Sequence, residues 1–197
     1  MKYFTADLHL FDEDILGYRG LSSMDAYHEL IRRGLEPLTP DDDLYILGDI
    51  TMTPGRQIDA VMFIENSCKA RIHLVPGNHD DWTTLLYAIQ SGWDVWGSMM
   101  VEIDGKKFIC THYPVHQDEL QWFEGNIHGH IHAPNPPYYE PYHWPNACKF
   151  DGAFVTEPYM NVNVEFQHFS PVDEHEVKLY FHFSQVDTNE VKLHFDR

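Results

Sequence analysis

Short apolar runs recur along the first 132 residues and alternate with polar or amphipathic segments, a pattern that predicts an α/β sheet. Each run is about the length of a buried strand and ends in polar residues. The four clearest runs are residues 3–6, 44–47, 72–76 and 108–111. Residues 99–103 and 106–111 flank Asp104-Gly105, which predicts a two-residue hairpin turn.

Helices are predicted where apolar residues recur at helical spacing. Ser22-Ser23 precede a predicted helix at about 24–33, with Gly34 as its stop. Two further helices are predicted at about 57–66 and 82–90. Residues 160–166 alternate between apolar and polar side chains, which predicts one more strand.

The composition changes at about residue 133. A loop rich in proline and aromatic residues extends to about residue 158, and its prolines exclude a helix or a central strand. The tail then repeats itself, because residues 170–181 align with 184–195 at an offset of 14. Each copy has the capping-box spacing of a helix but also alternates like a strand, so its type stays open. With 197 residues, we predict a single domain spanning residues 1–197.

Charge and cysteine content restrict the partners and the compartment. The formal net charge is -18, from 31 acidic and 13 basic residues. A long nucleic-acid partner is disfavoured, since binding one requires clustered Lys and Arg. The three cysteines are scattered and do not suggest a disulfide framework. No leader pattern and no apolar stretch of about 20 residues is found, so we expect a cytoplasmic protein without a membrane partner.

Polar motifs follow the predicted strands, where open α/β sheets build their sites. They are Asp7-Leu-His9, Gly48-Asp49, Gly77-Asn78-His79-Asp80, His112-Tyr-Pro and Gly129-His130-Ile-His132. On an extended segment, an Asp-x-His or His-x-His pair directs both side chains to one face. Two such ligands can therefore reach one ion.

The seven metal-ligand side chains divide into two sets that share Asp49. One ion is predicted to bind Asp7, His9, Asp49 and His132. The other is predicted to bind Asp49, Asn78, His112 and His130. Such ligation suits two divalent transition ions, of which we expect manganese first, with iron, zinc, nickel or cobalt also compatible. Two ions about 3.5 to 4 Å apart with a bridging hydroxide suit the hydrolysis of a phosphate ester.

His79 is not needed as a ligand. Beside Asn78 it could face the substrate and protonate the leaving oxygen, with Asp80 or Asp81 orienting its ring. Asn78 would lie near the substrate as well. Four other histidines have no supporting pattern, and we expect them on the surface or in the core: His73, His116, His128 and His143.

Together and in this order, the motifs resemble the calcineurin-like metallophosphoesterase superfamily over nearly the whole chain. The hairpin before His112 and the Asn161-Val-x-Val164 strand are most similar to the small bacterial and phage-type phosphoesterases. The resemblance implies a four-layer α-β-β-α sandwich of two mixed sheets flanked by helices. It also implies the division of metal ligands given above.

The sequence departs from its relatives at two places. Phosphoprotein phosphatases carry Gly-Asp-x-x-Asp-Arg-Gly, but residues 48–54 lack the Arg, which disfavours protein phosphatase activity. Small phage-type members usually have a His and an Asn soon after Asp-x-His, where this chain has Asp12 and Asp14. Arg19 is then the cationic candidate for a phosphate contact.

We therefore expect hydrolysis of a small phosphomonoester or phosphodiester. Four aromatic residues of the loop could stack on the base of a nucleotide or cyclic nucleotide, or merely pack the loop onto the body: Tyr138, Tyr139, Tyr142 and Trp144. A nuclease of the same superfamily is the alternative, and the net charge disfavours it. A non-catalytic binding scaffold is disfavoured because His79 and every expected ligand are present. The oligomeric state is not indicated.

Overall fold

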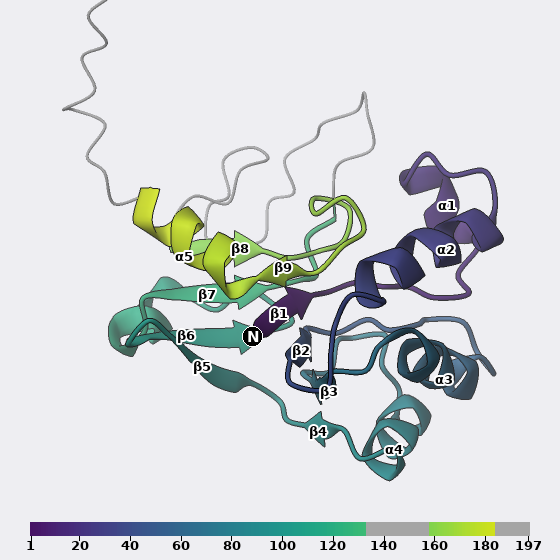
Figure 1. Cartoon of the computed structure of the whole chain (residues 1–197), viewed down its shortest axis with the longest axis horizontal. Helices are drawn as coiled ribbons and strands as arrows, with labels where there is room; N and C mark the ends of the chain where they lie inside the picture. Colours follow the sequence, from purple (N-terminus) through teal and green to yellow (C-terminus); the bar gives the residue numbers. More distant parts are fainter. Residues whose placement is uncertain (133–157, 184–197) are drawn as a thin grey trace, which may run out of the picture.

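Two mixed β-sheets lie at the centre of the structure, a computed structural model that describes residues 1–132 and 158–183 (Figure 1). The first sheet has the strand order β4-β3-β2-β1-β9. All neighbours in it are parallel except β9, which runs antiparallel to β1. Its strands are β1 (Lys2–Thr5), β2 (Asp43–Ile46), β3 (Arg71–Leu74), β4 (Asp94–Val95) and β9 (Val172–Asp173).

The second sheet has the order β5-β6-β7-β8. The predicted hairpin is confirmed, because β5 (Met99–Ile103) and β6 (Lys106–Thr111) pair antiparallel around Asp104-Gly105. β7 (Gly125–His128) is parallel to β6, and β8 (Tyr159–Asn161) is parallel to β7. Both sheets are therefore mixed, as the predicted fold class requires.

Helices α2 and α4 begin at residues whose side chains cap them. Ser23 accepts a hydrogen bond from the Ala26 N–H at the start of α2 (Met24–Leu35), and Asp81 accepts one from Thr84 at the start of α4 (Trp82–Gln90). The others are α1 (Asp14–Tyr18), α3 (Gln57–Ser67), α5 (Glu174–Phe183) and the 3-10 helix η1 (Gln117–Trp122). The three helices predicted at 24–33, 57–66 and 82–90 are confirmed within two residues at their ends.

Gly34 does not end α2, contrary to the prediction. The helix continues to Leu35, and a Cβ on Gly34 would lie 2.5 Å from the Phe169 carbonyl oxygen and 3.0 Å from Ser170 Cα. The glycine is therefore required for the close approach of the segment before β9.

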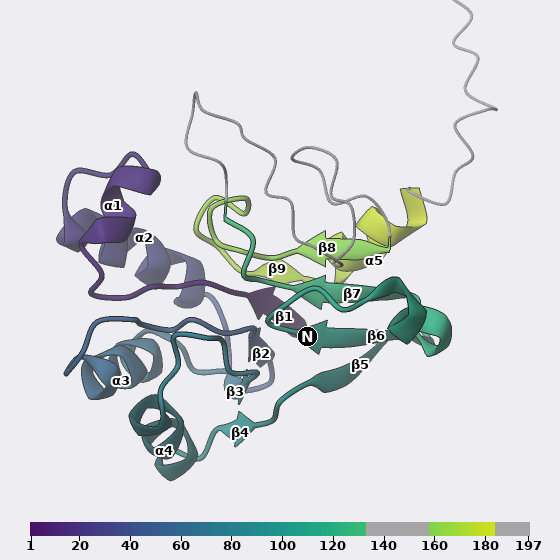
Figure 2. The ribbon, with the colours of Figure 1, turned by 180° about the vertical axis from the view of Figure 1, so that it is seen from behind.

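Helices α1 to α4 lie on one side of the first sheet and the second sheet lies on the other, as both views show (Figures 1 and 2). One core packs α2, α3 and α4 against β1 to β3 through residues such as Ile31, Ile64 and Leu74. A second core lies between the sheets and includes Phe4, Phe108 and, from α5, Phe181. Two mixed sheets flanked by helices are thus confirmed. None of the described helices is long and apolar enough to cross a membrane.

The strand predicted at 160–166 is shorter than expected. β8 ends at Asn161, although the chain still forms a single bridge between Asn163 and Ala6. The Asn161 side chain accepts a hydrogen bond from the Asn163 N–H, and the Asn163 side chain accepts one from the Glu165 N–H. These local side-chain bonds replace the ladder and turn the chain.

The first copy of the tail repeat is resolved in favour of a helix. Asp173 accepts a hydrogen bond from the Glu176 N–H, and Glu176 accepts one from the Asp173 N–H, which is the reciprocal capping box at the start of α5. The second copy and the proline and aromatic loop with Tyr138, Tyr139, Tyr142 and Trp144 lie outside the described residues.

Candidate metal centre

Two groups of potential metal ligands lie at the carboxyl ends of strands from both sheets. The first group is Asp7, His9 and His132, and the second is Asp49, His112 and His130. Within each group the ligand atoms lie within 4.8 Å of one another. The ligands follow β1 and β2 in the first sheet and β6 and β7 in the second, so each group is shared between the sheets.

Asp49 belongs to the second group and also lies close to His9 of the first group. Its Oδ2 is 3.7 Å from His9 Nε2 and 3.5 Å from His112 Nε2. Its Oδ1 accepts a hydrogen bond of 2.9 Å from the His79 N–H. A carboxylate oxygen so placed between two imidazole nitrogens is suited to bridge two cations about 3.5 to 4 Å apart.

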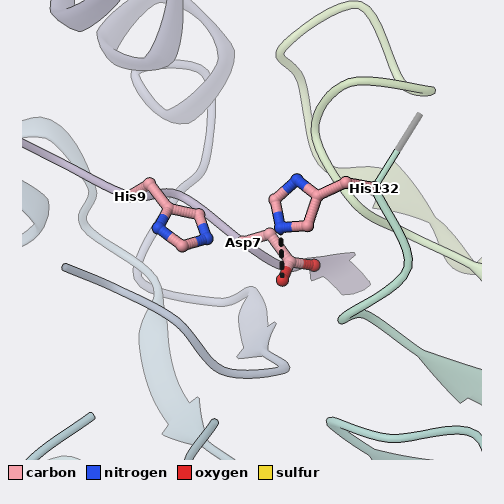
Figure 3. Close-up of side chains that lie close together, drawn as sticks. All are labelled: Asp7, His9 and His132. Carbon is pink, nitrogen blue, oxygen red and sulfur yellow. Dashed lines mark ion pairs between the residues drawn. The ribbon is translucent and has the colours of Figure 1, made fainter. Parts of the chain in front are cut away.

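In the first group, the side chains converge from separate segments (Figure 3). His132 Nε2 is 3.6 Å from Asp7 Oδ1, and its Nδ1 lies 2.7 Å from Glu165 Oε1. The carboxylate of Glu165 holds the proton on Nδ1 and leaves Nε2 as the ligand atom. Both ring nitrogens of His9 are buried and have no hydrogen-bond partner among the described residues, as expected for an imidazole arranged to bind a cation.

In the second group, His112 Nδ1 donates a hydrogen bond of 2.8 Å to the Leu47 carbonyl oxygen. The lone pair of its Nε2 therefore faces Asn78 Oδ1 at 3.0 Å. Two acceptor atoms this close do not stabilise each other without a shared cation. This contact supports Asn78 as a ligand of the second group.

The backbone of four ligand residues is left-handed. The φ angles are 57° at Asp7, 42° at His9, 56° at Asp49 and 67° at His130. The expectation that Asp7 and His9 share a face of an extended segment is therefore wrong, because β1 ends at Thr5. The two side chains converge through left-handed backbone conformations. Such conformations cost energy, persist only where the surrounding structure holds them, and cluster at functional sites.

Gly48, Gly77 and Gly129 lie in close contact with the candidate ligands. A Cβ on Gly129 would lie 2.6 Å from Asp7 Oδ2, and one on Gly77 would lie 2.6 Å from the Asp49 nitrogen. A Cβ on Gly48 would collide with the His112 ring. The glycines that precede Asp49, Asn78 and His130 therefore leave space that a ligand from another segment occupies.

Burial shifts the pKa values of several residues in the two ligand groups. It raises the pKa of Asp7 to about 8, although His132 acts in the opposite direction. Burial also lowers the pKa of His9 to about 2 and of His130 to about 4, so both imidazoles are neutral and can ligate. For His132, burial opposes protonation, but the hydrogen bond to Glu165 and the negative charges of Asp7 and Glu165 together outweigh it and raise the pKa. A buried carboxylate beside the neutral imidazole of His9 fits a divalent cation.

His79 is exposed at the edge of the site, with its ring 5.5 Å from the His9 ring. Asp80 does not orient it. The Asp80 carboxylate accepts hydrogen bonds from the backbone N–H groups of Asp49 (2.9 Å), Ile50 (2.9 Å) and Gly77 (2.8 Å). Asp81 instead caps α4 and accepts a bond from Gln57. Asp80 therefore ties together the two loops that carry Asp49 and His79, and the predicted catalytic contact is absent.

Arg19 is also placed differently from the prediction. Its side chain is fully buried and forms an ion pair with Glu165, with Nε 3.1 Å from Oε1. A cation turned into the interior does not contact a phosphate at the surface of the site, so this prediction is wrong. Asp12 is buried as well, with Oδ2 3.6 Å from His9 Nδ1.

Sequence reasoning missed Glu165, which lies just beyond the Asn161-Val-x-Val164 motif. No local pattern marks it, because its partners Arg19 and His132 come from other parts of the chain. It also missed Tyr113, which is 43% exposed and whose ring lies 4.2 Å from that of His130.

The histidines without a motif lie outside the two groups. His128 is buried, His116 is exposed and His73 lies between Asp43 and Asp94. These placements confirm the expectation of surface or core positions for all three. His143 lies outside the described residues.

Several solved structures align with this chain, including the following three. A protein of unknown function from Aquifex aeolicus, AQ665, aligns at 23% identity over 91% of this chain and 98% of its own, with a TM-score of 0.65. An archaeal phosphodiesterase aligns at 18% identity over 82% of this chain and 81% of its own, with a TM-score of 0.44. The phosphopantetheinyl hydrolase of Mycobacterium tuberculosis aligns at 16% identity over 58% of this chain and 43% of its own, with a TM-score of 0.38.

The first of these alignments supports the fold alone, and the other two superpose too loosely to add to it. No curated protein shows significant sequence similarity to the chain. The sequence profile described as calcineurin-like phosphoesterase matches residues 3–180, which contain both ligand groups. The chain therefore belongs to the calcineurin-like phosphoesterase family.

Proposed function

We propose that this protein is a two-metal phosphoesterase that hydrolyses a small phosphomonoester or phosphodiester. The observation that carries the proposal is the position of Asp49, whose Oδ2 lies within 3.7 Å of a histidine nitrogen from each ligand group. A pair of isolated metal sites would not require this shared carboxylate. Family membership supports the same chemistry.

Two divalent cations, when bound, would activate water near neutral pH and withdraw negative charge from the phosphoryl oxygens. The chain supplies the rest. Asp7 and Asp49 would provide the negative charge that holds the cations, and the imidazoles and the Asn78 amide would provide the remaining ligands. The mixed set of carboxylate, amide and imidazole donors is compatible with manganese, which remains our first expectation.

His79 is proposed to act on the leaving group. Its backbone N–H is fixed by Asp49 Oδ1, so the ring is held beside the bridging carboxylate while it stays exposed. An imidazole in this position can donate a proton to the oxygen that leaves the phosphorus. Because Arg19 faces the interior, we infer that the substrate phosphate is held by the cations, His79 and the amide of Asn78.

A small substrate is favoured by the charge of the chain. The formal net charge of -18 repels a long polyanion, whereas two cations would make the site itself locally positive. The exposed ring of Tyr113 beside His130 offers an aromatic surface for the organic part of a substrate. A nucleotide or cyclic nucleotide therefore remains a candidate.

The test is a screen of divalent metals against p-nitrophenyl phosphate and bis-p-nitrophenyl phosphate, with metal content measured in parallel. His79→Ala should lower turnover by roughly 10² to 10⁴-fold while metal content stays near two per chain. His175→Ala, on an exposed face of α5, is the matched control and should leave turnover unchanged.

Three results would contradict the proposal. Unchanged turnover in His79→Ala would remove the role of that residue. Metal-replete protein that is inert on both esters would favour a binding scaffold. Strong retention on a DNA column at moderate salt, together with cleavage of DNA, would favour the nuclease alternative.

A further inference from the structure

Arg19 makes a network of contacts that the proposed reaction does not use. Its guanidinium donates from Nη2 to the Asp7 carbonyl oxygen at 2.6 Å and from Nη1 to the Leu8 carbonyl oxygen at 3.2 Å. It donates from Nε to Glu165 Oε1 at 3.1 Å. Nη1 also contacts the Tyr27 hydroxyl, which bonds to the Leu8 carbonyl oxygen in turn. The Arg19 side chain has no exposed surface.

These contacts reach both halves of the first ligand group. Asp7 and Leu8 belong to the loop in which Asp7 and His9 adopt left-handed φ angles of 57° and 42°. On the other side, Glu165 Oε1 lies 2.7 Å from His132 Nδ1, so the oxygen that binds Arg19 also orients His132. One guanidinium therefore connects the loop after β1 to the ligand that follows β7.

We propose that Arg19 is a positioning residue for the cation bound by Asp7, His9 and His132. It holds the strained loop through two backbone carbonyl groups and fixes His132 through Glu165. Within the described residues, Arg19 makes no direct contact with the side chains of the second group, where the Leu47 carbonyl oxygen holds His112 Nδ1. Loss of the network should therefore weaken one cation site and spare the other.

An arginine suits this position because its planar fork donates in several fixed directions at once. A lysine at position 19 keeps the charge that compensates Glu165, but a single ammonium cannot reach Glu165 and both carbonyl groups in the same geometry. Glu165→Gln keeps an acceptor for His132 and removes the charge. These two substitutions therefore interrupt the network at its two ends without leaving a cavity.

The experiment uses the whole chain and cobalt, whose visible absorption reports on ligand geometry and whose binding is followed by calorimetry. In Arg19→Lys and in Glu165→Gln, the dissociation constant of one cobalt ion should rise about 10 to 100-fold, and that of the other should change little. In the double variant the two effects should be less than additive, because both substitutions disturb the same Arg19–Glu165 ion pair. Arg33→Lys, which alters an exposed ion pair with Glu29, is the matched control.

Folding is checked separately by circular dichroism and thermal unfolding in chelator. If Arg19→Lys does not fold, Glu165→Gln alone still tests the selective loss of one site. Equal weakening of both sites, or additive effects in the double variant, would overturn the inference.

The inference rests on the metal-binding role proposed above, and the two can fail separately. Unaltered protein that binds no cobalt would overturn both. Unaltered protein that binds two ions, with both variants binding them equally well, would overturn only the role of Arg19.

Discussion

Gly77→Ala offers a sharp test of the site, because it adds one methyl group against the bridging carboxylate. The new Cβ would lie 2.6 Å from the Asp49 nitrogen and 2.8 Å from Asp49 Cγ, and closer still to Oδ1. Real Cβ atoms essentially never approach a heavy atom within 3.0 Å. Asp49 is buried and its nitrogen is held by Asp80, so it cannot move alone.

The expected displacement of Asp49 is about half an ångström or more. Overpacking of this kind costs about 1 to 3 kcal/mol of stability. Since a misplacement of about 1 Å in an active site can cost about 10²-fold in rate, we expect turnover to fall roughly 10 to 10²-fold. Both cations should also bind more weakly, because Asp49 is the ligand that we propose they share.

The assay compares Gly77→Ala with Gly97→Ala, where the added Cβ would meet no heavy atom within 4 Å. Turnover of bis-p-nitrophenyl phosphate, metal affinity by calorimetry and urea unfolding in chelator are measured for both. The control should match the unaltered protein in all three. If Gly77→Ala also matches it, Asp49 does not lie where the structure places it, and the bridging argument fails.

Three further predictions concern the same site. Asp80→Ala removes the acceptor of the buried N–H groups of Asp49 and Ile50. In urea denaturation the free energy of unfolding should fall by roughly 2 to 6 kcal/mol, and metal content should fall with it. A stable variant with two cations and slow turnover would instead support a catalytic role for Asp80. Burial raises the pKa of Asp7 to about 8, so below that pH a cation must displace a proton from Asp7. In calorimetric titrations the affinity of the protein for that cation should rise about tenfold per pH unit towards pH 8 and then level off. An affinity that does not change from pH 6 to 8 would contradict this prediction. Removing metal with a chelator should lower the thermal midpoint, since each cation at 100 times its dissociation constant adds about 2.7 kcal/mol; an unchanged midpoint would mean that no cation binds the folded state.

The identity of the candidate ligands was predictable from sequence. Asp, His and Asn side chains after apolar runs are visible directly, and strands that end at one rim must bring such side chains together. The two ligand groups contain six of the seven predicted metal ligands, and Asn78 lies beside His112. Amphipathic spacing and capping residues likewise predicted α2, α3 and α4.

Properties that depend on distant partners were not predictable. Arg19 was expected to contact the substrate. Its side chain is instead buried in an ion pair with Glu165, which lies 146 positions away in the chain, so no local pattern could reveal the contact. Asp80 was expected beside His79, but its partners are backbone N–H groups, which every sequence contains and no pattern reveals. The left-handed conformations of Asp7 and His9 were also not predictable, because the backbone N–H groups of these residues bond to the Gly48 and Asp49 carbonyl oxygens of another loop.

The division of each ligand group between the two sheets has a consequence for how the protein matures. Asp7 and His130, which are joined through the His130 N–H and the Asp7 carboxylate, are 123 positions apart in the chain. During synthesis, Asp7, His9 and Asp49 leave the ribosome long before His130 and His132. Neither group is complete until β7 has joined β6, so cation loading follows the assembly of the second sheet. A bound cation would then link the loop after β1 or β2 to the segment after β7, and a chain truncated before β7 would lack His130 and His132.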